Sequence, residues 1–290
     1  MTNESDLYRQ SRRYHAAKAQ FHRWFQLYER PRTPELVERQ LQMFADRFEI
    51  VTAGGATVRT REGYRNGIGR YGSEDRHGHR VQRVTVEEFG FHFLSLQADV
   101  LYQYRGAAGA VTGAHVSYEC ELTGSADFEP LFTRLRITPV GSTSGGEFID
   151  TYPANRALAL VYRWLSLVEE PSLGVGPFSE LLAPDNEFSL RFGSAPITDR
   201  RAVAAWLQAS SQRVATSRHT VAAFSATETE PGKYMVSMDF DWHGTDAGDH
   251  PRSGRVHHEW TLVDTGERYC RILQAQATPI IPISRARQST

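Results

Sequence analysis

The sequence predicts an α+β protein built from two tandem copies of one domain. Three observations support this prediction. The chain has 290 residues, about twice the length of a typical single domain. It resembles itself at a shift of 140 residues, and both halves show the same order of helical and strand patterns. The internal similarity therefore favours two copies of one domain over two unrelated domains.

The repeat runs without a gap through most of each half. Arg23 and Trp24 align with Arg163 and Trp164. Further identities at this shift are Leu27/Leu167, Glu29/Glu169, Leu41/Leu181, Phe48/Phe188, His79/His219, Asp99/Asp239, Glu119/Glu259 and Leu122/Leu262. Residues 141–153, GSTSGGEFIDTYP, are rich in Gly and Ser, as is typical of a linker. We therefore expect domains at 8–140 and 154–283, joined by a linker at 141–153.

The helices of each copy come first. Apolar residues at helical spacing predict helices at 14–28 and 155–168, followed by shorter helical stretches at 33–44 and 177–182. A strand is expected next, at 47–52 and 187–192. Thr60 and Thr198 are then the expected N-caps of a third helix, which in the second copy covers 202–209.

The remainder of each copy is rich in strands. They are expected at 80–88, 98–104, 115–122 and 133–138, with counterparts 140 residues later. The segments HVSYECEL and RVHHEWTL alternate apolar and polar residues, which indicates strands with one buried face. Each half thus presents helices followed by a sheet.

Composition narrows the function classes. With 40% hydrophobic residues, 23% charged residues and a net charge of -1, the chain is an ordinary globular protein with no electrostatic reason to bind nucleic acid. The longest apolar run, 157–168, is short and interrupted by Arg163, so we expect no membrane span. The N-terminus lacks the apolar stretch of a signal peptide, and we expect a cytoplasmic protein.

Two residue types add minor constraints. Almost all of the basic residues are arginine and only Lys18 and Lys233 are lysine, which indicates a bacterial source with a GC-rich genome. Cys120 and Cys270 lie far apart without CxxC spacing, so we expect reduced core cysteines and no disulfide or zinc ribbon.

The order of elements resembles a known superfamily. A long helix, a short helix, the phrase FADRF at 44–48, a helix opened by a Thr-Arg or Thr-Asp-Arg turn and four strands are similar to the nuclear transport factor 2-like superfamily. Both copies most resemble its SnoaL-like branch, of the scytalone dehydratase and dehydrochlorinase type. The resemblance implies two cone-shaped domains, each a strongly bent antiparallel sheet wrapped around helices with an apolar pocket at the wide end.

The resemblance also implies a catalytic pair in each copy. In the dehydratase branch, a carboxylate at the end of the first helix holds a histidine that removes a proton from the substrate. Glu29 and His79 match these positions in the first copy, and Glu169 and His219 match them in the second, with Glu in place of Asp. A carboxylate bonded to one imidazole nitrogen fixes the tautomer and raises the basicity of the other nitrogen. Ordinary solvated residues are the competing interpretation.

Strand parity suggests the pocket walls, because residues i and i+2 share a face. We expect the substrate pockets to be lined by Trp24, Tyr102, Tyr104 and Tyr118 in the first copy and by Trp164, Trp242 and His258 in the second. By the same parity Asp99, Glu119, Asp239 and Glu259 point to the opposite face unless a bulge reverses the register.

The spacing of the histidines does not match a metal-binding motif. Neither His77 and His79 nor His257 and His258 form a two-histidine, one-carboxylate pattern, so we expect no metal and no cofactor.

The resemblance, carried onto these residues, implies a cofactor-independent lyase, cyclase or isomerase acting on a small, mostly apolar cyclic or aromatic metabolite, in bacterial secondary metabolism (polyketide-type) or catabolism. A non-catalytic protein that binds a hydrophobic ligand or acts as a scaffold is the alternative. An oxygenase subunit is a weaker one, as is a polyether-type epoxide-opening cyclase, because Glu62 is replaced by Ala202 in the second copy. The fusion would replace a homodimer by an intrachain pseudo-dimer, with further homo-oligomers left open.

Overall fold

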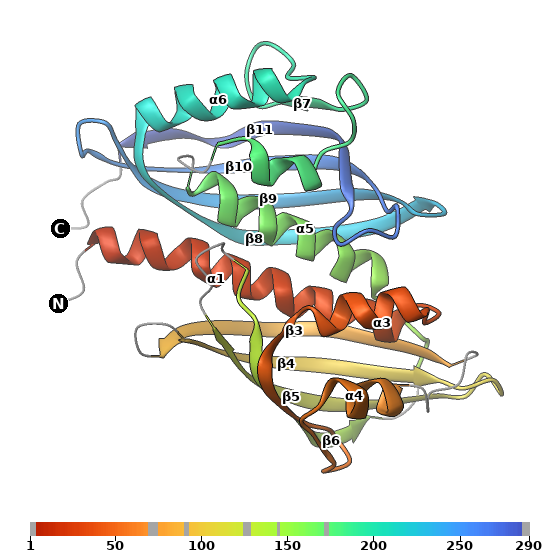
Figure 1. The fold of residues 1–290 in the computed structure, drawn as a ribbon. Helices are drawn as coiled ribbons and strands as arrows, with labels where there is room; N and C mark the ends of the chain where they lie inside the picture. The colour runs from red at the N-terminus through yellow and green to blue at the C-terminus, as the bar shows by residue number, and fades with distance from the viewer. Residues whose placement is uncertain are drawn as a thin grey trace. The chain divides into compact units, whose positions relative to one another are not determined.

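A computed structural model of the protein describes residues 4–68, 75–89, 93–123, 129–143, 146–170 and 174–285. Each half of the chain forms a curved sheet that packs against helices (Figure 1). The fold class predicted from the sequence is therefore confirmed. No helix among the described residues is long and apolar enough to cross a membrane.

The first repeat begins with helices. Its elements are α1 (Glu4–Trp24), α2 (Gln26–Glu29), α3 (Pro34–Leu41), β1 (Phe44–Val51), β2 (Thr57–Val58), α4 (Arg61–Ile68), β3 (Arg76–Phe89), β4 (Phe93–Arg105), β5 (Val111–Thr123) and β6 (Phe132–Thr143). The expected helix at 14–28 is longer than predicted and is interrupted at Phe25. Thr60 caps α4 as predicted, because its hydroxyl accepts the Gly63 N–H at 3.0 Å.

The second repeat follows the same order. Its elements are α5 (Tyr152–Val168), the 3₁₀ helix η2 (Gly176–Glu180), β7 (Ser189–Arg191), α6 (Arg200–Arg213), β8 (Val214–Glu230), β9 (Lys233–Asp246), β10 (Pro251–Val263) and β11 (Arg271–Arg285). The prediction that Thr198 caps α6 is wrong. Asp199 takes that position and accepts the Ala202 N–H at 2.7 Å, since its carboxylate is the stronger acceptor one residue closer to the helix.

The two sheets share the same order of five strands, and the first sheet has β2 as an additional edge strand. Their strand orders are β2-β1-β6-β5-β4-β3 and β7-β11-β10-β9-β8. The long strands pair antiparallel as expected, but β1 pairs parallel with β6 and β7 pairs parallel with β11. The expectation of purely antiparallel sheets is corrected here. A long connection through α4 and four strands separates β1 from β6, which gives the chain room for a parallel pairing.

Bulges recur in the two sheets at the repeat distance. The register shifts between Val81 and Arg83 in the first sheet and between Val221 and Ala223 in the second. Two further shifts, before Val116 and Leu122, recur before Val256 and Leu262. A bulge bends the strand that carries it and increases its twist. The repeated bulges explain how each sheet curves around its helices.

Aromatic side chains from the helices fill each concave face. Trp24 packs edge-on against Phe44 and Phe132, with ring centroids 5.6 and 6.2 Å apart. In the second repeat, Trp164 packs in the same way against Phe178 and Trp260 at 5.0 and 5.7 Å. Such edge-to-face pairs add to the stabilisation from burial. Cys120 and Cys270 are both buried and form no disulfide with each other.

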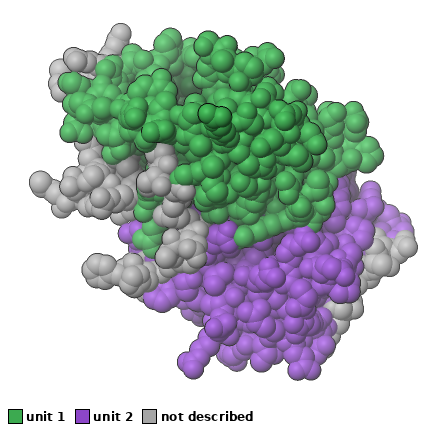
Figure 2. Space-filling model, turned by 45° about the horizontal axis from the view of Figure 1, so that its top comes forward, with its two compact units in different colours: residues 1–15, 160–290 green, residues 16–159 purple. Residues whose placement is uncertain are grey.

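The chain divides into two compact units whose boundaries fall inside helices α1 and α5. Unit 1 comprises residues 1–15 and 160–290, and unit 2 comprises residues 16–159 (Figure 2). Within the segment predicted as a linker, residues 141–143 continue β6, Thr151 is buried, and Tyr152 begins α5. The first turns of each long helix thus belong with the other repeat.

Candidate functional site

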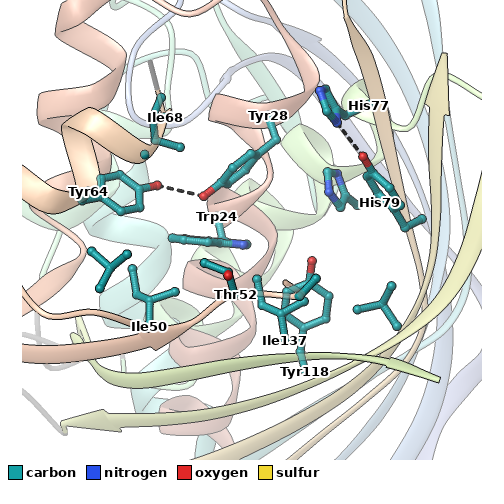
Figure 3. A pocket seen from close by; sticks show the side chains of 15 residues that line it. Trp24, Tyr28, Ile50, Thr52, Tyr64, Ile68, His77, His79, Tyr118 and Ile137 are labelled. Carbon is teal, nitrogen blue, oxygen red and sulfur yellow. Dashed lines mark hydrogen bonds between the residues drawn. The ribbon is translucent and has the colours of Figure 1, made fainter. Parts of the chain in front are cut away.

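Unit 2 contains a cavity of about 230 Å³ between its helices and its sheet. Figure 3 shows Trp24 across its middle, the hydroxyls of Tyr28 and Tyr64 turned toward each other, and His77 and His79 side by side on one wall. The two tyrosine hydroxyls are 3.0 Å apart. Among the described residues, no Asp, Glu, Arg or Lys lines this cavity.

A buried carboxylate holds the histidine of this wall. Oε1 of Glu29, which is fully buried, lies 3.2 Å from Nδ1 of His79 and accepts the His79 backbone N–H at 3.0 Å. The same oxygen accepts the Thr151 hydroxyl at 2.6 Å and the Asn155 amide at 2.9 Å. Four donors therefore converge on one oxygen. No described residue donates to the other oxygen, Oε2.

Local structure explains this placement. Glu29 is the last residue of α2, and the chain turns to an extended conformation at Arg30. His79 pairs with Tyr102 across β3 and β4, just before the bulge after Val81. Its ring stacks on Phe25, with centroids 4.6 Å apart. The helix end and the bent strand thus bring together residues 50 positions apart in the chain.

Unit 1 repeats the pair with a different third partner. Oε1 of Glu169 lies 3.0 Å from Nδ1 of His219 and accepts the His219 backbone N–H at 2.6 Å. Nε2 of His15, a buried residue of α1, lies 3.2 Å from the same oxygen. His15 stacks on Tyr162 at 5.8 Å. His15 and Asn155 occupy equivalent positions of the repeat, so each glutamate is held by a residue from the first turns of the other repeat's helix.

The pocket of unit 1 is larger, about 500 Å³, and both Glu169 and His219 line it. Burial favours the neutral form of Glu169, but His15 and His219 outweigh this effect and lower its pKa to about 2. Glu169 is therefore ionised at neutral pH. An ionised carboxylate accepts the Nδ1 proton of His219, which leaves Nε2 as the basic nitrogen.

Most of the predicted wall residues line the cavities. Trp24, Tyr102 and Tyr118 line the smaller pocket, and Trp164, Trp242 and His258 line the larger one. Tyr104 does not. Its hydroxyl donates to Asp75 at 2.8 Å instead, because the side chain lies at the end of β4 beyond the cavity. The strand acids Asp99, Glu119, Asp239 and Glu259 line neither pocket.

Sequence reasoning missed several contributors. His15, Thr151 and Asn155 support the glutamates, and Tyr28, Tyr64 and His77 line the smaller pocket. Extending the comparison of the two copies toward the N-terminus would have aligned His15 with Asn155 and Ser11 with Thr151. Within the described part of the chain, no group of three or more His, Cys, Asp or Glu is placed to hold a metal ion.

Three histidines of these sites are held neutral. Burial is the main cause that lowers the pKa of His22 and of His77 to about 4, and that of His258 to about 3. Coulombic interactions with nearby basic side chains lower each pKa further: Lys18 for His22, His79 and Arg32 for His77, and His219 and His257 for His258.

We expect these histidines to make the fold acid-sensitive. An unfolded histidine binds a proton near pH 6.5, whereas the folded ones resist protonation, so stability falls as pH falls from about 6.5 to about 4. Each histidine contributes on the order of 1–3 kcal/mol. Urea unfolding at pH 7 and pH 5 measures the loss. His22→Gln should reduce it, whereas the control His115→Gln at an exposed strand position should not. Equal stability at both pH values would contradict the prediction.

The fold and the sites define a class of protein: a tandem α+β chain with a bent sheet and an apolar ligand-sized pocket in each repeat. No protein-family model matches the sequence, and no curated protein matches it significantly. Solved structures do resemble parts of it.

A proposed aromatic ring hydroxylase from Novosphingobium aromaticivorans is 10% identical, with 48% of this chain and 96% of that chain covered and a TM-score of 0.42. A type 2 hexachlorocyclohexane dehydrochlorinase is 17% identical, with 50% and 95% covered and a TM-score of 0.40. A nuclear transport factor 2-like protein from Salmonella enterica is 8% identical, with 45% and 89% covered and a TM-score of 0.37. Each of these structures covers about half of this chain.

Proposed function

We propose that the chain is a cofactor-independent lyase, cyclase or isomerase in which His79 and His219 remove a proton from a small, mostly apolar cyclic or aromatic metabolite. One observation carries the proposal: each repeat places a buried glutamate on Nδ1 of a histidine that lines an aromatic pocket. No described residue bonds to Nε2 of either histidine. This nitrogen is therefore free to accept a proton from a ligand.

The chemistry needs no other group. The Nε2 lone pair takes a proton from a carbon of the ligand, and the electrons of the C–H bond form a double bond while a leaving group departs or a neighbouring π system accepts the charge. The protonated histidine then returns the proton to the leaving group or to another carbon. The glutamate stabilises the imidazolium that forms between these steps. Proton transfer by a positioned base such as this histidine contributes ~10²–10⁴-fold.

Burial strengthens the hydrogen bonds between each glutamate and its histidine. Glu29 and Glu169 are both fully buried, and His79 is nearly so. Water competes little for these hydrogen bonds, and electrostatic interactions are stronger in such surroundings than in bulk water. The aromatic walls favour ligands with flat apolar rings. The supporting features therefore agree on a histidine base that is held by a buried carboxylate and faces an aromatic pocket.

A general probe of carbon deprotonation tests the proposal without knowledge of the natural substrate. Nitrobenzisoxazole is small and aromatic, and removal of its ring C–H proton breaks the N–O bond to give a coloured nitrophenolate. We expect the wild-type protein to accelerate this ring opening and the double variant His79→Ala/His219→Ala to lose ~10²–10⁴-fold in kcat/KM. The single variants show how the two sites share the activity.

The exposed His115, which lines neither pocket, provides the matched control, and His115→Ala should keep the full rate. Circular dichroism and thermal unfolding establish that each variant is folded. A folded double variant that opens the ring as fast as the wild type would overturn the proposal.

A further inference from the structure

The two pockets differ in charge. The smaller pocket has no Asp, Glu, Arg or Lys among its described lining residues. The larger pocket is lined by Glu169, Arg213, Asp246 and Arg252. The positions equivalent to Asp246 and Arg252 in the first repeat are Gly106 and Thr112, so these charges belong to the second repeat only.

Most of these charges are already compensated. Glu169 is bonded to His15 and His219. Asp246 accepts Nε and Nη2 of Arg252 at 2.9 and 2.6 Å, together with the backbone N–H groups of Gly248 and His250. The hydrogen bonds from Arg252 are the main cause that holds the pKa of Asp246 well below its usual range. Asp246 is therefore a fixed partner of Arg252.

Arg213 is the exception. It is the last residue of α6, where the chain passes directly into β8 (Figure 1). Its Nε donates to the Ala209 carbonyl at 3.1 Å, which fixes the side chain, and no carboxylate among the described residues pairs with its terminal nitrogens. The residue lines the pocket and is also exposed, so its charge lies at the pocket mouth.

The rest of the pocket is suited to the body of an aromatic ligand. Its walls include Trp164, Phe192, Trp206, Phe240 and Trp242. The hydroxyl-bearing residues Ser210 and Ser217 line it as well, close in sequence to Arg213. The result is an aromatic interior with His219 in its wall and one uncompensated positive charge at its entrance.

We infer that the larger pocket binds an aromatic carboxylate, with its rings against the tryptophans and its carboxylate on Arg213, whereas the smaller pocket takes only smaller, uncharged ligands. The planar guanidinium matches the two oxygens of a carboxylate. The inference rests on the proposed function in treating both pockets as ligand sites. It adds the class of ligand and a division of labour between the repeats.

Equilibrium binding of naphthoate and of its uncharged methyl ester tests the inference. Tryptophans 164, 206 and 242 line the larger pocket, so quenching of tryptophan fluorescence reports on occupancy there. We expect wild-type protein to bind naphthoate at least fivefold more tightly than the ester at low salt, with the preference weakening as salt is added. Arg213→Gln should lower the affinity for naphthoate about fivefold and leave that for the ester unchanged.

Arg201→Gln is the matched control, because Arg201 is an exposed arginine on the same helix that does not line the pocket. It should change neither affinity. Equal binding of the two compounds by the wild type, no binding of either, or an equal loss of both in Arg213→Gln would overturn the inference. His219→Ala should keep the preference for naphthoate, so loss of turnover in that variant tests the proposed function separately.

Discussion

Glu29→Ala is expected to lower the free energy of unfolding by about 3–5 kcal/mol. The substitution leaves the Asn155 amide, the Thr151 hydroxyl and the N–H groups of His79 buried without their shared acceptor. The Thr151 hydroxyl and the Nδ1–H of His79 then lack an acceptor and carry the full cost of desolvation, whereas the Asn155 amide keeps the His79 carbonyl and the His79 backbone N–H keeps the Thr151 hydroxyl. The ring-opening rate of the first site should fall as far as in His79→Ala, because nothing then holds the tautomer of the histidine.

Chemical denaturation monitored by circular dichroism measures the loss of stability. The rate of nitrobenzisoxazole ring opening by the double variant Glu29→Ala/His219→Ala, compared with His219→Ala alone, measures the loss of activity at the first site. Glu29→Gln separates the two. Its amide oxygen still accepts hydrogen bonds from the same donors, but it carries no charge to stabilise an imidazolium. We expect Glu29→Gln to recover much of the stability and little of the rate. A Glu29→Ala protein as stable as the wild type would show that the four hydrogen bonds contribute nothing.

His15→Ala is expected to destabilise unit 1 by about 1.5–3 kcal/mol, the range for a hydrogen bond to a charged group. His15 donates to the buried Glu169 carboxylate and stacks on Tyr162. His15 also helps to lower the pKa of Glu169, so this pKa should rise in the variant. A lowered pKa stabilises the fold above the unfolded value near 4.5, and this contribution is lost as pH falls toward 2. The difference between wild type and variant should therefore shrink below about pH 4.5.

The first repeat supplies the matched variant. Asn155 occupies the position equivalent to His15 and donates its amide to Glu29 at 2.9 Å. We expect His15→Asn to recover most of the stability lost in His15→Ala, because the amide restores a donor to Glu169. Denaturation curves of the three proteins between pH 7 and pH 3 measure both effects. The prediction fails if His15→Asn is as unstable as His15→Ala at neutral pH.

Local patterns were sufficient to predict much of the fold. The positions of the long strands followed from alternation, and the inward face of β5, with Val116, Tyr118 and Cys120 buried, followed from parity. The N-cap at Thr60 was predicted correctly, but the one at Thr198 was off by a residue, because neighbouring capping residues compete and only the backbone geometry selects between them.

The candidate site was predictable in part. The repeat singled out the Glu29/His79 and Glu169/His219 positions, and the structure places each pair within hydrogen-bond distance. Tyr104 shares a strand face with Tyr102, but parity does not show where a cavity ends along the strand. His77 was considered only as a metal ligand, although it lies two residues before His79 on the same strand and also lines the pocket.

The sequence by itself determined the tandem architecture, the order of elements and the residues that both copies retain, because these depend on periodicity and on identity at a constant spacing. Only the tertiary structure decided which residues support each glutamate. His15 and Glu169 are 154 positions apart, and Asn155 and Glu29 are 126 apart. Such contacts depend on how whole helices pack, which no local pattern records. The same packing sets the sizes of the two pockets and leaves the charge of Arg213 at the mouth of the larger one.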